Sequence, residues 1–179
     1  TLALGTAAPA DGVESSAIGS GAIASAQGAQ AIGYNSRAVG IGSIALGGDA
    51  GDALLFGAEA NANFAVAIGT DSRASGIQSL ALGYLAVASD ESAIALGAQA
   101  TATVGNAIAI GQQANSGFTG SIAIGGDTDD LDLIGAQATG PASVAIGADA
   151  VSSSSQATSL GTSARATNVE ATALGQNTS

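Results

Sequence analysis

The sequence predicts an all-β solenoid, in which short strands wind into a stack of similar coils of about 14 residues. A glycine recurs along the whole chain, mostly at 14-residue intervals, with a large apolar residue before it and small residues after it. A fixed period with a fixed internal pattern indicates one repeated supersecondary unit. The composition agrees, because 27 glycines and 3% aromatic residues among 179 can build many thin layers but no bulky core.

The first strand of each coil ends at this glycine, which we number as position 0. Position −1 is large and apolar in every unit, and position −3 is often Leu, Ile or Val. Alternation with period 2 places −1 and −3 on one face of a strand and −2 on the other. We expect position −1 to form the core, at Ile68, Leu82, Leu96, Ile110, Ile124 and Ile146. The unit glycines are Gly5, Gly19, Gly33, Gly47, Gly57, Gly69, Gly83, Gly97, Gly111, Gly125, Gly135, Gly147, Gly161 and Gly175.

A tight corner follows the first strand, because glycine accepts backbone conformations that other residues resist. This predicts turn glycines at Gly33, Gly83, Gly97, Gly111, Gly125 and Gly147. Positions +3 and +5 are mostly Ala or Ser, which predicts a second short strand across a thin interior. Helices are not expected, since glycine interrupts every segment.

Position −2 is Ala in eleven units, Ser159 in one, and Leu55 and Leu133 in the other two. If −1 points inward, −2 points outward, where a surface exposed to water would vary and carry charge. Two interpretations stay open: alanine is merely tolerated in a thin strand, or another copy of the chain packs against it. The second predicts a homo-oligomer with an interface at Ala81, Ala95, Ala109, Ala123 and Ala145.

Two stretches depart from the 14-residue spacing. The intervals are 10 and 12 residues around Gly57, and the same two intervals recur around Gly135. We interpret both glycines as starts of complete coils with shortened second corners. The series then repeats with a period of 78, which predicts a single domain over residues 1–179. Within it, residues 5–82 and 83–160 form an internal duplication, and residues 161–179 a partial third copy.

The composition excludes several functions. A net charge of −11 with no lysine excludes nucleic acid as a partner. The absence of cysteine and histidine excludes disulfides and thiolate metal sites. No apolar run approaches the ~20 residues that cross a bilayer, so no direct membrane insertion of this fragment is expected. Fourteen carboxylates without histidine, mostly at corners, predict a solvated surface, with no catalytic residue and no cofactor.

The units at residues 106–111, 121–125 and 143–147 read Asn-Ala-Ile-Ala-Ile-Gly, Ser-Ile-Ala-Ile-Gly and Ser-Val-Ala-Ile-Gly. They resemble the head repeats of trimeric autotransporter adhesins, in particular a YadA-like head, over nearly the whole chain. The resemblance implies a left-handed parallel β-roll that assembles into a homotrimeric rod on a Gram-negative cell surface, anchored in the outer membrane. The family's neck, stalk and membrane anchor have no counterpart here. The family's collagen-binding unit, Asn-Ser-Val-Ala-Ile-Gly, has no intact copy.

The resemblance implies an adhesin head that attaches to host extracellular matrix or cells through many weak contacts. Candidate contact residues are Tyr34, Tyr84, Asn106, Arg37, Arg73 and Arg165. The arginines share position +4, which should face outward, either solvated or paired with an acidic neighbour. Two alternatives stay open. An ice- or mineral-binding solenoid would need a regular threonine array, and a calcium-dependent secreted solenoid would use the acidic cluster at residues 127–132 (Asp127 to Asp132), which otherwise is a solvated corner.

Overall fold

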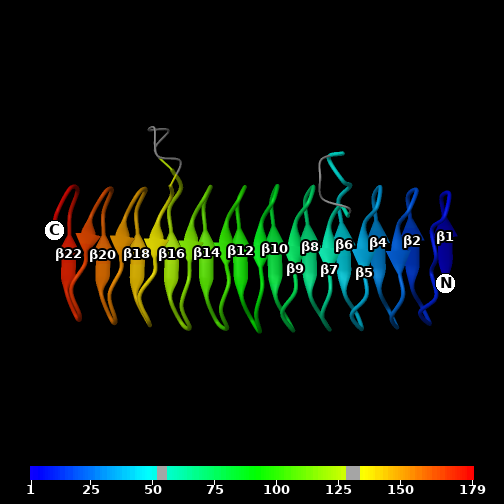
Figure 1. The fold of residues 1–179 in the computed structure, drawn as a ribbon, viewed down its shortest axis with the longest axis horizontal. Coiled ribbons are helices and arrows are strands. Elements are labelled where there is room, and N and C mark those ends of the chain that lie inside the picture. Colours follow the sequence, from blue (N-terminus) through cyan, green and yellow to red (C-terminus); the bar gives the residue numbers. More distant parts are fainter. Residues whose placement is uncertain (52–55, 128–133) are drawn as a thin grey trace.

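The structure, a computed structural model, is a rod of stacked coils, and it describes residues 1–51, 56–127 and 134–179 (Figure 1). In its described part, strands are the only regular secondary structure. They form two sheets in which all neighbouring strands are parallel. The twelve-stranded sheet contains β1 (Leu2–Leu4), β2 (Ser16–Ile18), β4 (Gln30–Ile32), β6 (Ile44–Leu46), β8 (Val66–Ile68), β10 (Leu80–Leu82), β12 (Ile94–Leu96), β14 (Ile108–Ile110), β16 (Ile122–Ile124), β18 (Val144–Ile146), β20 (Thr158–Leu160) and β22 (Thr172–Leu174).

The ten-stranded sheet is made of the second strand of each coil. It contains β3 (Ile23–Ala24), β5 (Arg37–Ala38), β7 (Glu59–Ala60), β9 (Arg73–Ala74), β11 (Val87–Ala88), β13 (Thr101–Ala102), β15 (Asn115–Ser116), β17 (Gln137–Ala138), β19 (Val151–Ser152) and β21 (Arg165–Ala166). Equivalent positions of successive coils stand side by side, as in the pairing of Ala81 with Ala95 and of Ala95 with Ala109. The predicted all-β solenoid of about 14-residue coils is therefore confirmed.

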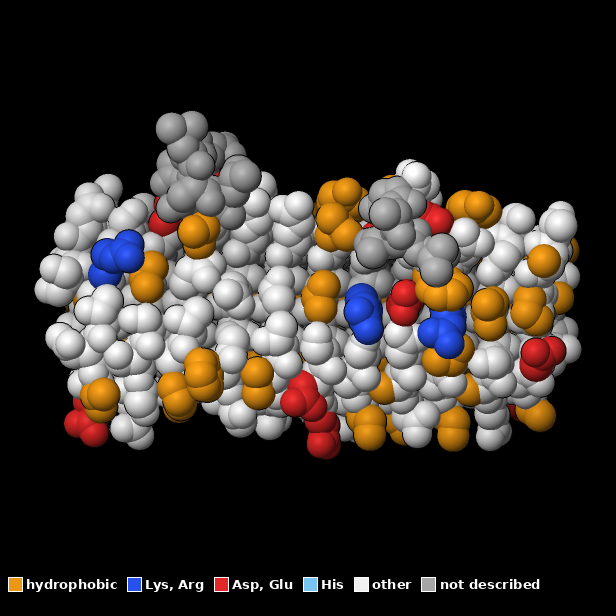
Figure 2. All heavy atoms as spheres, viewed as in Figure 1, with side chains coloured by type: hydrophobic (Ala, Val, Ile, Leu, Met, Phe, Trp, Pro, Cys, Tyr) orange, Lys and Arg blue, Asp and Glu red, His pale blue; other side chains and the backbone are white. Residues whose placement is uncertain are grey.

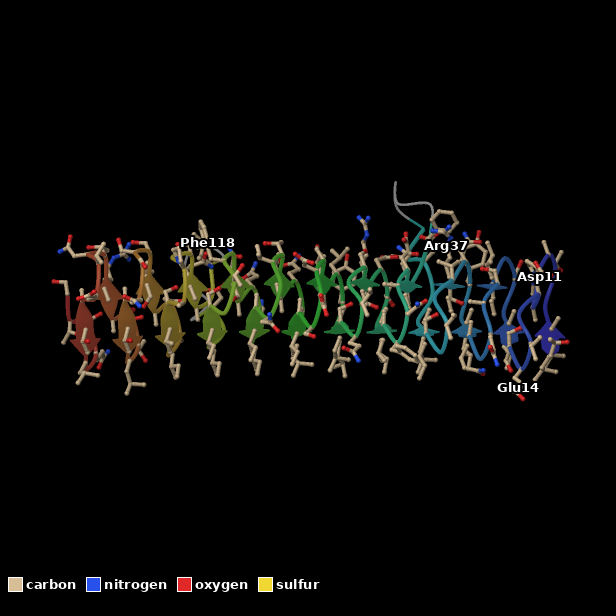
Figure 3. All side chains as sticks on the ribbon, turned by 90° about the horizontal axis from the view of Figure 1, so that it is seen from below. Asp11, Glu14, Arg37 and Phe118 are labelled. Atoms are coloured by element: carbon tan, nitrogen blue, oxygen red, sulfur yellow. The ribbon has the colours of Figure 1, made fainter. Side chains whose placement is uncertain are left out.

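The predicted facing of the first strand is wrong, because in the described residues the side chains between the two sheets are those of alanine and serine. The side chains that were assigned to an outer trimer face, Ala81, Ala95, Ala109, Ala123 and Ala145, are 0% exposed within the single chain. The residues that were assigned to the core point outward: Leu82 is 44% exposed, and Ile68, Leu96, Ile110, Ile124 and Ile146 are half-buried. Figure 3 shows large side chains projecting from the twelve-stranded sheet, away from the second sheet.

The physical reason is the short distance between the two sheets. Ser152 of β19 and Ser159 of β20 face each other across the interior, and their Oγ atoms lie 2.8 Å apart in a hydrogen bond. A side chain with one heavy atom beyond Cβ thus already reaches the opposite sheet. A leucine or isoleucine at position −2 would overlap that sheet, so the strand turns its large residues outward and its alanines inward.

Each corner after the first strand needs its glycine for two reasons. The six predicted turn glycines have φ between +127° and +143°, a region that disfavours other residues. The coils also touch here, because a Cβ placed on Gly97 would lie 2.5 Å from the carbonyl oxygen of Gly111. The glycines therefore stack directly upon one another along the rod.

Gly57 and Gly135 do not begin coils, which corrects the interpretation of the short intervals. Strand β6 pairs directly with β8, and β16 with β18, so each 22-residue interval is one coil. The N–H of Ala58 donates to the oxygen of Gly47, as that of Ser36 does to Gly33, which places Ala58 at position +3. Each of these two coils therefore contains eight extra residues after position +1. They are residues 49–56 in the first coil and residues 127–134 in the second. The carboxylate of Asp132, at a position −3 that should be apolar, also predicted a reversed facing of this strand, but residues 131–133 lie outside the described residues.

The described residues of the two insertions, 49–51 and 56 in one and 127 and 134 in the other, lie at the same edge of the rod (Figure 1). The insertions begin at Asp49 and Asp127, which are 78 residues apart, in agreement with the period of the glycine series. The duplication of residues 5–82 and 83–160 stays a prediction.

Candidate interaction surfaces

The outward face of the twelve-stranded sheet carries two neighbouring columns of large apolar side chains, at positions −1 and −3. We call this surface the apolar stripe, and its members in β6 to β18 are Ile44, Leu46, Val66, Ile68, Leu80, Leu82, Ile94, Leu96, Ile108, Ile110, Ile122, Ile124, Val144 and Ile146. All of them are half-buried or exposed. Neighbouring strands lie about 4.8 Å apart, so the side chains flank one another and the stripe is continuous along the rod.

The stripe narrows toward both ends of the rod. Position −3 is Ser16 and Gln30 near one end and Thr158 and Thr172 near the other, whereas position −1 stays apolar. None of the twelve described strands carries a charged residue at either position. Soluble monomers rarely expose an uncharged apolar surface of this extent, which marks the stripe as an interaction surface.

The opposite face, formed by the ten-stranded sheet, carries all three basic residues of the chain (Figure 2). Position +4 points outward as predicted, because Arg73 and Arg165 are exposed and Arg37 is half-buried. The Cα of Glu59 pairs with those of Arg37 and Arg73, so an acidic neighbour stands between these two arginines. The sequence left open whether an arginine at this position is solvated or paired with an acidic neighbour, and Glu59 is such a neighbour in an adjacent coil.

Arg37 is held in place by two contacts from the following coil. Its guanidinium lies 5.3 Å from the centroid of the Phe56 ring, within the range of a cation–π interaction. Its Nη1 also donates to Oδ1 of Asn61 at 3.2 Å, while Nδ2 of Asn61 donates to Oε2 of Glu59 at 2.7 Å. Sequence reasoning missed Phe56 and Asn61 as partners, because the insertion sets their positions.

The other candidate contact residues lie on different sides of the rod. Tyr34 and Tyr84 are 54% and 47% exposed beside the first corner. Asn106 lies at the second corner with φ +58°, where its N–H donates to the oxygen of Glu91. The structure therefore brings no tyrosine together with Asn106 or with the arginines as one site of the kind that a single ligand would occupy.

Two cavities lie at the feet of the insertions, on the face of the ten-stranded sheet. Cavity A has a volume of about 240 Å³ and is lined by Phe56, Asp71, Arg73 and Val87, among others. Cavity B has a volume of about 270 Å³ and is lined by Ile134, Asp149, Val151 and Arg165, among others. The sequence contained no signal for them, because each cavity joins the end of an insertion to the two following coils.

The described part of the chain gives little support to the two alternative functions, a calcium-dependent secreted solenoid and an ice- or mineral-binding solenoid. Residues 1–51, 56–127 and 134–179 contain no group of three carboxylates placed to hold a metal ion. Of the acidic cluster at residues 127–132, only Asp127 is described. Thr158 and Thr172 are neighbours in the twelve-stranded sheet, but Thr101 belongs to the other sheet, so these threonines share no plane. In the part that the structure describes, no helix is long and apolar enough to span a membrane.

The repeat of this chain matches the model of a known protein family. The YadA head domain repeat, defined over two copies, matches residues 1–22, 10–36, 24–50, 56–72, 74–103, 105–128, 134–150 and 152–178. None of the curated proteins matches the chain. The family matches omit residues 51–55 and 129–133, which belong to the two insertions. The insertions therefore interrupt a repeat that otherwise runs through the chain.

Proposed function

Because the chain belongs to the YadA head-repeat family, we propose that it is the head of a homotrimeric adhesin on the bacterial outer surface, anchored in the outer membrane by other parts of the protein. The observation that carries the proposal is the apolar stripe, in a chain whose repeats match the family from residue 1 to residue 178. The stripe supports assembly, and the repetitive outer faces support attachment to host extracellular matrix or host cells.

A parallel trimer would bury all three stripes at once. Each solenoid is straight and offers one uncharged apolar face, so three copies around a common axis can meet along their full length. Burial of apolar surface contributes about 25 cal/mol per Å², and here it would add to an interior that is built, in the described part of the chain, from alanine and serine. Association would therefore supply the large-side-chain packing that a single coil lacks.

In such a trimer the ten-stranded sheets and the corners face outward. Every surface feature then occurs three times around the axis, and coil-related features recur along it. Attachment would rest on many weak contacts acting together, which raises the overall avidity without a deep pocket.

The test joins assembly to attachment. We expect the purified 179-residue chain to sediment at three times its monomer mass of 16.7 kDa. We also expect beads coated with it to bind cultured host cells or immobilised matrix proteins more than beads coated with albumin. A folded monomer at micromolar concentration would refute the trimer, and a trimer that attaches to no cell or matrix protein would refute the adhesin.

A further inference from the structure

A third hollow lies on the ten-stranded sheet beside cavity B, and we call it hollow C. Its volume is about 330 Å³, and three successive coils contribute to its lining. Five of the six lining side chains are polar and uncharged, so the hollow offers hydrogen-bond donors and acceptors without a charge. The lining residues are Gln99, Thr101, Gln113, Asn115, Ile134 and Gln137.

Cavities A and B differ from hollow C because each of them contains opposite charges. Arg73 shares cavity A with the carboxylates of Glu59 and Asp71, and Arg165 shares cavity B with that of Asp149. A charged ligand of either sign would therefore meet a like charge in both cavities. Hollow C has no charged residue in its lining, so an uncharged polar ligand meets no such penalty there.

Hollow C is open because two of its side chains are small. Asn115 stands where the coil before the first insertion has Arg37, since both pair with the coil that carries the insertion. Ile134 ends the second insertion as Phe56 ends the first. At the first insertion the guanidinium of Arg37 lies 5.3 Å from the centroid of the Phe56 ring and takes up the equivalent space. The smaller pair leaves this space free at the second insertion.

Two amides of hollow C are held in fixed orientations. Nδ2 of Asn115 donates to Oε1 of Gln137 at 3.1 Å, and Nε2 of Gln137 donates to the oxygen of Gly135 at 3.1 Å. Within the described residues, Oδ1 of Asn115 accepts no hydrogen bond. This oxygen is therefore an acceptor whose position is set before a ligand arrives, which lowers the entropic cost of binding.

Two further amides stand side by side at the rim of hollow C. Gln99 and Gln113 each lie two residues before Thr101 and Asn115, which pair in the sheet, so about 4.8 Å separates the two coils. Oε1 of Gln113 is buried and has no hydrogen-bond partner among the described residues. A buried acceptor without a partner costs free energy, which a ligand hydroxyl would recover after a small turn of the side chain.

An uncharged sugar suits these groups. A pyranose carries adjacent hydroxyl groups that both donate and accept, as a primary amide does through its NH₂ group and its oxygen. The side chain of Ile134, 42% exposed, can cover the C–H face of the ring. The volume of hollow C lies at the lower end of the roughly 300–1,000 Å³ of small-molecule sites, which fits one sugar unit.

We propose that hollow C binds a neutral sugar unit presented by a host glycan. Gln99, Gln113 and Asn115 pair with its hydroxyl groups, and Ile134 covers one face of the ring. This inference rests on the proposed adhesin function and gives it a class of ligand. In the trimer the ten-stranded sheets face outward, so three such sites would act together on clustered glycans.

The direct test measures binding of the assembled protein to albumin that carries glucose, galactose, mannose or N-acetylglucosamine. Unmodified albumin and albumin carrying sialyllactose are the references. We expect binding to at least one neutral conjugate, and at least a tenfold loss for Asn115→Arg with Ile134→Phe, which fills hollow C as Arg37 and Phe56 fill the equivalent space. Thr167→Arg with Val169→Phe adds the same two side chains at exposed positions outside the hollow and should bind as the wild type does.

A second variant removes the amides without adding bulk or charge. Gln99→Leu with Gln113→Leu should also lose at least tenfold in sugar binding. Its thermal unfolding should match the wild type, because Gln99 is exposed and Oε1 of Gln113 has no partner to lose in the described part of the chain. A wild-type protein that binds no neutral conjugate better than the references, or wild-type binding by either double variant, would overturn the proposal.

Attachment of coated beads to host cells separates this site from the adhesin function. If the Gln99→Leu and Gln113→Leu variant attaches less than the wild type, hollow C is supported as the ligand site. If both attach equally well, the adhesin function stands and the glycan proposal fails. If the wild type binds a sugar conjugate but no cell, the adhesin function fails while the sugar site stands.

Discussion

At the scale of single residues, this fold depends on small side chains where most proteins place large ones. Four positions of each coil face the interior, and in the coil around Gly97 they are Ala93, Ala95, Ala100 and Ala102, all 0% exposed. The usual expectation that large apolar residues lie inside fails here because the sheets are too close. The signal was nevertheless present, since small residues at −2, +3 and +5 recur through the chain.

Enlarging one interior side chain should therefore be more harmful than removing a large outer one. We expect Ala109→Leu to lower the free energy of unfolding by about 1–3 kcal/mol or more, as overpacking does. Thr103→Leu adds the same side chain at an exposed position and should have little effect. Chemical denaturation measures both variants. Equal stability of Ala109→Leu and the wild type would contradict the alanine interior.

The corner glycines differ in the reason why the position requires glycine. Gly97 combines φ +133° with a neighbouring carbonyl oxygen 2.5 Å from its potential Cβ. Gly120 has φ +67° with open space around it, and alanine occupies the equivalent corner at Ala142 with φ +51°.

Alanine at these two glycines should separate backbone strain from contact between coils. Gly120→Ala should cost about 1–2 kcal/mol, the strain of a left-handed residue. Gly97→Ala should cost clearly more, because its methyl group would force two coils apart. Thermal unfolding of the two variants decides this, and equal melting temperatures would show that the glycine stack has no steric role.

At the scale of elements, the 14-residue coil was predictable and the insertions were misinterpreted. The periodic glycine and the alternating strand are local signals, so they predict strands, corners and stacking from sequence alone. The facing of a strand depends on the space left by the opposite sheet, which alternation does not reveal. The intervals of 10 and 12 residues sum to 22, which is one coil of 14 residues plus eight inserted residues. Gly57 and Gly135 directly follow the insertions, and for this reason they were mistaken for the first glycine of a new coil.

Removing an insertion should restore an ordinary coil. The potential Cβ of Gly57 lies 2.4 Å from the carbonyl carbon of Gly48, so the chain ends on either side of residues 49–56 are adjacent. We expect the deletion of residues 49–56 to fold as the wild type does and to unfold within a few degrees of it. Deleting eight residues that span a strand, 80–87, is the control and should disrupt the stack. Loss of strand signal in circular dichroism after the first deletion would contradict the assignment of an insertion.

At the scale of the whole molecule, the two faces of the rod have opposite characters. One face is the apolar stripe, without charge in any described strand, and the other carries the arginines and the cavities. Moving the predicted interface from the −2 alanines to the −1 and −3 side chains changes which substitutions should prevent assembly. It also explains why such a thin solenoid carries its largest side chains outside.

Two glutamates on the stripe should therefore break the proposed trimer. Leu82→Glu with Leu96→Glu places adjacent charges at the centre of the stripe, where burial of an unpaired carboxylate is strongly unfavourable. Thr101→Glu with Asn115→Glu adds the same charge on adjacent strands of the opposite sheet and should leave the trimer intact. Sedimentation and circular dichroism must be measured together, because an isolated solenoid unfolds more readily if assembly stabilises it. A folded trimer that tolerates the leucine changes as well as the control would refute the stripe as the subunit interface, while leaving the solenoid fold unaffected.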